Sequence, residues 1–134
     1  MEIHFESEKP IYLQIAEQLE EAILSGAFPE ETQIPSTTEI SITFKINPAT
    51  ALKGINLLVD ADIIYKKRGL GMFVKAGAKN RILEQHKQAF YQTYIVTLLS
   101  EAKTLKISKA KLLDMIERGY EYESPDSERS RNGI

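Results

Sequence analysis

The 134-residue chain contains no cysteine, no tryptophan and only two histidines. The lack of cysteine excludes a disulfide scaffold, a thiol nucleophile and a cysteine-based zinc finger, and it agrees with the reducing cytoplasm, where we expect the protein. His4 and His86 are far apart in the sequence, so we expect no metal site and no cofactor. No stretch approaches the roughly 18 apolar residues of a membrane span. The acidic start of the chain also lacks the apolar run of a signal peptide.

Charge is distributed unevenly along the chain. The formal net charge of −2 argues weakly against a nucleic-acid-binding protein. Residues 1–44, however, carry one lysine against nine glutamates, a net charge of −8. Residues 45–75 carry six lysines or arginines against two aspartates, a net charge of +4. Such a basic cluster is either a solvated charged face or a surface for the phosphates of DNA.

The most specific pattern in the sequence is that of a helix-turn-helix. Ser36 is a favourable helix N-cap, and Glu39 three residues later completes a capping box, which predicts a helix over residues 37–44. A three-residue turn follows, and Pro48 then opens a further helix with Asn47 as its cap. In DNA-binding proteins, the second helix of such a pair enters the major groove.

A third helix is expected before this pair, from Pro10 to Gly26, with apolar side chains at helical spacing. The helix that begins at Pro48 contains Gly54, which is unfavourable there by roughly 1 kcal/mol relative to alanine. Either a neighbouring backbone packs closely against Gly54, or this helix is locally weak.

A basic hairpin follows the helices. Residues 63–65 begin a strand rich in β-branched and aromatic residues, Gly69-Leu70-Gly71 forms the tip, and residues 72–74 return. Three helices and a hairpin could form an ordinary α+β domain. The proline-opened helix after a short turn and the basic strand before the glycines instead favour a winged helix-turn-helix over residues 1–77.

Several polar and basic side chains of this domain are expected to contact DNA. The first turn of the helix that begins at Pro48 offers groups for base edges or phosphates, and the helix that follows Ser36 offers hydroxyls to a phosphate. The hairpin offers cations to the DNA backbone or the minor groove. The predicted DNA-binding residues are Ser36, Thr37, Thr38, Asn47, Ala49, Thr50, Lys53, Lys67, Arg68 and Gly69.

The C-terminal part is expected to be helical. The apolar pattern predicts a long helix over residues 79–104 and a shorter one that Ser108 caps and Gly119 ends. Residues 121–134 read as a flexible polar tail. Because residues 78–120 are too few for a second globular core, we expect their apolar stripe to be buried against a second copy of the chain. The predicted dimerisation residues are Phe90, Tyr94, Ile95, Leu98 and Leu99.

The sequence resembles the GntR family of bacterial transcription regulators over residues 10–74. Four segments carry the resemblance: Pro10-Ile11-Tyr12-Leu13-Gln14-Ile15, Ile34-Pro35-Ser36, Asn47-Pro48-x-Thr50, and Arg68-Gly69-x-Gly71-x-Phe73-Val74, where x is any residue. The short helical C-terminal part is similar to the YtrA-type branch. That resemblance implies two C-terminal dimerisation helices and no large ligand-binding domain. The expected fold is therefore α+β and mainly α.

The chain departs from the family pattern at several positions. Family members usually carry a DNA-contacting arginine where this chain has Thr38, and often an asparagine where it has Ala49. They often carry Ala-Tyr where this chain has Gly54-Ile55, and the usual Pro-Gly is missing from residues 27–31. The substitution at Thr38 suggests a weaker or altered affinity for DNA.

We expect a dimeric transcription regulator, a repressor that binds double-stranded DNA at a palindromic operator. The alternative is a winged-helix module for protein interaction, in which DNA binding is lost or depends on an effector. A small-molecule effector would bind between the C-terminal helices near Tyr91 and Tyr94. We do not expect an enzyme, because the sequence has no nucleophile elbow, and Gly69-Leu70-Gly71 is too short for a nucleotide-binding loop.

Overall fold

The computed structural model describes residues 2–122 of the chain. It divides into two units, Met1–Gln85 and His86–Ile134, which are described separately. The predicted flexible tail falls almost entirely on residues 123–134, which lie outside the described residues. Within residues 2–122, no helix is both long and apolar enough to cross a membrane.

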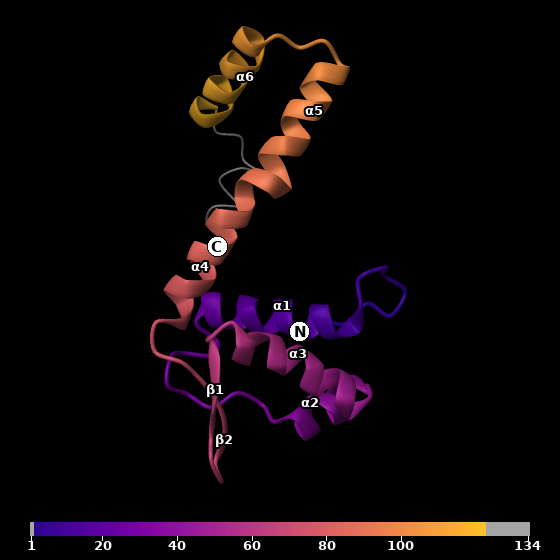
Figure 1. The fold of residues 1–134 in the computed structure, drawn as a ribbon, viewed down its shortest axis with the longest axis vertical. Helices are drawn as coiled ribbons and strands as arrows, with labels where there is room; N and C mark the ends of the chain where they lie inside the picture. Colours follow the sequence, from indigo (N-terminus) through magenta and orange to yellow (C-terminus); the bar gives the residue numbers. More distant parts are fainter. Residues whose placement is uncertain (1, 123–134) are drawn as a thin grey trace. The chain divides into compact units, whose positions relative to one another are not determined.

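Three helices build the first unit: α1 (Ile11–Ser25), α2 (Thr37–Phe44) and α3 (Pro48–Asp60). They surround a single apolar core, and α1 packs mainly on α3 (Figure 1). The largest fully buried side chains of this core are Ile15, Leu19, Ile40, Ile55, Leu58, Ile63, Ile64, Val74 and Ile82. The predicted helix-turn-helix is therefore confirmed, and α1 supports it by packing against α3.

Gly54 lies where α3 crosses α1. A Cβ atom at this position would come 2.7 Å from the carbonyl oxygen of Tyr12 and 2.9 Å from Cβ of Ile15. Real Cβ atoms do not approach other atoms this closely, so only glycine fits without a shift of the helices. Of the two readings that the sequence left open, the close approach of a neighbouring backbone is the correct one.

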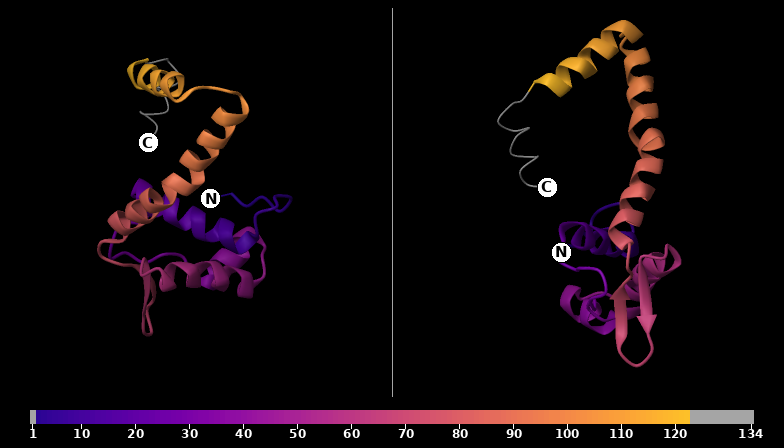
Figure 2. Two further views of the ribbon diagram at one scale, coloured as in Figure 1. Left: turned by 45° about the horizontal axis from the view of Figure 1, so that its top comes forward. Right: turned by 90° about the vertical axis from the view of Figure 1, so that its left-hand side faces the viewer.

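The wing is an antiparallel hairpin of β1 (Ile64–Lys67) and β2 (Gly71–Val74). Its register pairs Ile64 with Val74 and Lys67 with Gly71. The inner ends of both strands are buried in the core, whereas the tip extends beyond the three helices (Figure 2). The fold is thus the predicted winged helix-turn-helix.

Asp62 connects the segment before the wing with the segment after it. Its carboxylate accepts a hydrogen bond from Lys75 and lies 3.2 Å from a terminal nitrogen of Arg81, on α4 (Ala78–Phe90). The hydrogen bond from Lys75 lowers the pKa of Asp62, and the positive charges of Lys75 and Arg81 act in the same direction. The start of α4 is also anchored by the burial of Ala78 and Ile82 in the core.

The lowered pKa of Asp62 predicts a pH dependence. A carboxyl group with a lowered folded-state pKa stabilises the fold above its unfolded pKa of about 3.9, and this stability is lost as the pH falls through the folded value. We expect Asp62→Asn to be less stable than the parent at about pH 7, and the difference to narrow towards about pH 3. Urea unfolding at both pH values measures this. If the difference in unfolding free energy between Asp62→Asn and the parent did not change with pH, the ion pairs of Asp62 would contribute nothing to stability.

The second unit contains the end of α4, a π-helical turn η1 (Tyr91–Ile95), α5 (Val96–Thr104) and α6 (Lys109–Glu121). The predicted long helix is confirmed, although its π-helical turn was not foreseen. Ser108 caps α6 by accepting a hydrogen bond from the Lys111 amide, as predicted. The expectation that Gly119 ends this helix was wrong, because α6 continues to Glu121 before the extended Tyr122. Helix ends are often displaced by one or two residues from sequence signals.

Candidate nucleic-acid interface

The N-terminus of α2 has the predicted capping box. The side-chain oxygen of Ser36 accepts a hydrogen bond from the Glu39 amide at 3.0 Å, and the Glu39 carboxylate accepts one from the Ser36 amide at 3.2 Å. The Ser36 cap uses its oxygen as an acceptor, so its proton can still be donated to a ligand. Thr37 and Thr38 follow in the first turn, where the positive end of the helix dipole favours a phosphate.

The turn between α2 and α3 is held by two hydrogen bonds. The hydroxyl of Ser41 donates to the carbonyl oxygen of Ile46 at 2.9 Å, and the amide of Ile46 donates to the carbonyl oxygen of Ser41 at 3.0 Å. Lys45, between them, adopts the left-handed conformation with a φ of 53° and ends α2. These contacts fix the start of α3 relative to α2.

Asn47 caps α3 as predicted, with its side-chain oxygen 2.8 Å from the amide nitrogen of Ala49. The cap occupies only the oxygen, so the two side-chain N–H groups of Asn47 can still be donated. Asn47, Ala49 and Lys53 are exposed, and Thr50 is half-buried. The ammonium group of Lys53 lies over the ring of Tyr12, 4.1 Å from its centre, so this charge stays close to the protein surface.

The wing exposes all three of its predicted contact residues, Lys67, Arg68 and Gly69. Gly69 takes a φ of +77°, a conformation that side chains rarely adopt, which explains glycine at the tip. The ammonium group of Lys67 lies 4.6 Å from the centre of the Phe73 ring. The wing therefore carries exposed positive charge next to a glycine, whose lack of a side chain leaves the main chain accessible to a ligand.

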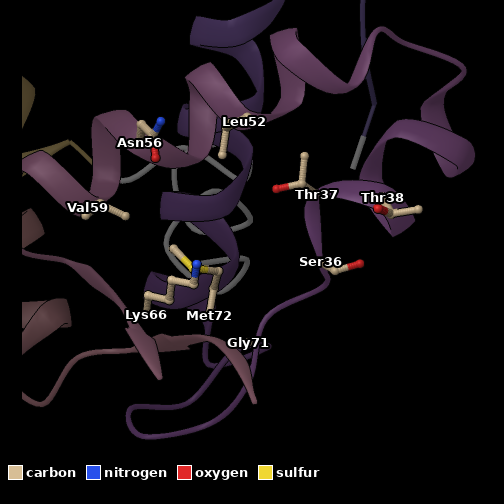
Figure 3. A pocket seen from close by; sticks show the side chains of 9 residues that line it. All are labelled: Ser36, Thr37, Thr38, Leu52, Asn56, Val59, Lys66, Gly71 and Met72. Carbon is tan, nitrogen blue, oxygen red and sulfur yellow. The ribbon is translucent and has the colours of Figure 1, made fainter. Parts of the chain in front are cut away.

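A hollow of about 420 Å³ lies between α2, α3 and the wing (Figure 3). The predicted residues Ser36, Thr37 and Thr38 line it, together with residues that the sequence analysis missed. These additional lining residues are Leu52, Asn56 and Val59 of α3, and Lys66, Gly71 and Met72 of the wing. Residues 52, 56 and 59 have the spacing of one helix face, a signal that could have identified them. The other predicted contact residues do not line this hollow.

Residues 2–122 contain no group of three histidine, cysteine, aspartate or glutamate side chains that could hold a metal ion. Of the cations in the basic segment, Lys75 is paired with Asp62 and thus belongs to the base of the wing. Lys66 and Lys67 are exposed on β1, and Arg68 is exposed in the turn that follows. The arrangement thus combines helix-terminal donors, polar groups on α3 and a basic wing.

The family of bacterial regulatory proteins called gntR matches residues 11–74, which span α1 to the end of the wing. A solved GntR-family regulator from Bacteroides thetaiotaomicron is 33% identical to the chain, with a TM-score of 0.70 over 83% of this chain and 96% of that one. The chain belongs to the GntR family. GntR proteins are transcription regulators, so this chain is a DNA-binding regulator and not an enzyme.

Two further proteins are similar to this chain. The transcriptional repressor YtrA of Bacillus subtilis (strain 168) is 29% identical over 110 residues, which cover 82% of this chain and 84% of YtrA. This similarity extends beyond the winged helix and supports the YtrA-type assignment. The DNA-binding domain of AraR, solved in complex with the operator ORX1, is 28% identical with a TM-score of 0.51, over 55% of this chain and 95% of that domain.

Proposed function

We propose that this GntR protein is a repressor that binds a palindromic operator as a homodimer. One observation carries the proposal: the N-terminus of α2, exposed residues of α3 and the basic wing surround one hollow, and the helices and the base of the wing share one core. The similarity to YtrA, a repressor of nearly the same length, supports repression rather than activation. The similarity to a domain in complex with operator DNA supports the partner.

In the proposed complex, α3 enters the major groove with its N-terminal turn leading. Asn47, Thr50 and Lys53 meet base edges or phosphates, and Ala49 meets a thymine methyl group. Ser36, Thr37 and Thr38 donate to a phosphate that lies against the start of α2. Lys67, Arg68 and Gly69 contact the adjacent backbone or the minor groove.

The proposed dimer is supported by the apolar surface of the second unit. Among its described residues, only Ala102 and Leu112 are buried, whereas Tyr94 is 62% exposed and Leu98 and Leu99 are 38% exposed. The rings of Phe90 and Tyr94 pack against each other, with their centres 5.3 Å apart. Exposed apolar surface of this extent is unusual in a monomer. In a twofold dimer, the same surface of a second copy would bury it.

Substitution of Lys53 tests the assignment of α3. If the ammonium group reaches a phosphate, Lys53→Ala should weaken operator binding and lower the slope of log affinity against log salt by about one. Fluorescence anisotropy over a range of salt concentrations measures this slope. Lys103→Ala, which removes a lysine from α5 instead, is the charge-matched control and should leave the slope unchanged. Equal slopes for both variants and the parent would exclude Lys53 as a phosphate contact.

A second candidate function rests on Thr38, which stands where the family usually has arginine, and on the net charge of −8 over residues 1–44. In this alternative, the winged helix binds another protein, or binds DNA only with an effector. Such an effector would contact the exposed Tyr91 and Tyr94 of the second unit. A winged helix that has lost DNA binding would show weak affinity without preference for any sequence, whereas the proposed repressor would not.

A further inference from the structure

Residues 32–34, which lead into α2, run along β2 of the wing. The amide of Ile34 donates to the carbonyl oxygen of Met72, and the amide of Val74 donates to that of Thr32, both at 2.9 Å. Gln33, between them, pairs with Phe73 as an isolated antiparallel bridge. The wing is thus a two-stranded hairpin to which a short third segment is added, close to the residues that start α2.

The side chain of Gln33 reaches further along the wing than its backbone does. Its amide nitrogen donates a hydrogen bond of 2.8 Å to the carbonyl oxygen of Leu70, at the tip of the hairpin and 37 residues away in the sequence. Leu70 itself closes the turn by donating its amide to the carbonyl oxygen of Lys67 at 2.9 Å. Gln33 is therefore bonded to the turn that carries Arg68 and Gly69.

Gly71 makes room for this contact. A Cβ atom on Gly71 would lie 2.5 Å from the side-chain nitrogen of Gln33, and the residue has a φ of +127°. Any other residue would both strain this backbone and displace the Gln33 amide. Gly71 and Gln33 therefore depend on each other: the Gln33 side chain crosses the start of β2 in the space that a side chain at position 71 would fill.

We propose that Gln33 is a positioning residue that holds the wing tip in the conformation that binds DNA. Strands of four residues make only a marginal hairpin without further support, so a bond to the tip should restrict its motion. A wing that is already ordered loses less entropy when Lys67 and Arg68 engage a phosphate. The inference rests on the proposed DNA binding and adds to it a residue outside the contact surface.

The test uses Gln33→Met, which keeps the length of the side chain and removes its donor. In the free full-length protein, the amides of residues 67–71 should exchange with solvent at least about threefold faster than in the parent. Operator affinity should fall by about threefold to tenfold. Gln18→Met is the matched control, because the Gln18 amide also donates to a main-chain carbonyl, that of Glu2, but lies on α1. This control should change neither quantity.

A double-mutant comparison separates positioning from general loss of stability. In the background Lys67→Ala with Arg68→Ala, the wing has no cations left to position, so Gln33→Met should cost less than about twofold in affinity. An equal loss in both backgrounds, or unchanged exchange at the wing tip, would overturn the inference while leaving DNA binding intact. A parent protein that binds no DNA would instead overturn both the proposed function and this role of Gln33.

Discussion

We expect Gly54→Val to lower the free energy of unfolding of the first unit by about 3 kcal/mol. The first atom of the new side chain would already lie 2.7 Å from the carbonyl oxygen of Tyr12, and this oxygen belongs to the main chain of α1. No change of side-chain rotamer relieves a contact with main-chain atoms, so α1 and α3 must separate. Because α1 and α3 supply half of the buried core residues, their separation loosens the packing of Ile15 and Ile55.

Gly119→Val is the matched control for this prediction. Gly119 is also inside a helix, and among the described residues nothing lies within 4 Å of a Cβ built on it. Valine and glycine differ by less than about 0.5 kcal/mol in helix propensity, so this substitution should be nearly neutral. Urea unfolding followed by circular dichroism compares the two variants with the parent. Similar small changes in both would mean that the α1–α3 approach is not as tight as the structure has it.

Disruption of the proposed dimer should have the largest effect on DNA binding. Leu98→Glu places a charge in the apolar surface of the second unit, and a twofold dimer would contain this charge twice. We expect the dimer to dissociate at least about 100-fold more readily, because an unpaired charge is costly to bury. A monomer binds only one half-site, so affinity for the full operator should also fall by about 100-fold or more.

Leu105→Glu makes the same change outside the proposed dimerisation residues. Leu105 is 66% exposed and follows directly after α5, so we expect this control to remain dimeric and to bind operator like the parent. Analytical ultracentrifugation gives the oligomeric state of each variant, and anisotropy with full and half operators gives its affinity. If Leu98→Glu remained dimeric, the proposed seam through Phe90, Tyr94, Ile95, Leu98 and Leu99 would be wrong.

The features that the sequence predicted are those specified by neighbouring residues. Ser36 with Glu39, and Asn47 with Pro48, act within one helical turn, so their patterns located the starts of α2 and α3 correctly. The glycines at the wing tip likewise encode a local backbone requirement. The choice of a winged fold over an ordinary α+β domain followed from the order of these local signals.

Contacts between distant residues could not be predicted in the same way. The bond from Gln33 to Leu70 depends on how the segment before α2 meets the wing, which no local pattern encodes. The hollow lined by Asn56 and Lys66 likewise exists only once α3 and the wing are packed together. For Gly54, the sequence raised a choice between two explanations, and only the position of α1 decided it.

The central claim is that this chain binds specific DNA through its winged helix. The most direct test is fluorescence anisotropy with the promoter DNA upstream of its own gene and with a scrambled duplex, at a low and a high salt concentration. We predict tight binding to the promoter that weakens steeply as salt rises, with at least about 1,000-fold weaker binding to the scrambled duplex. Equally weak binding to both duplexes would contradict the claim and would favour a winged helix that has lost DNA binding or needs an effector.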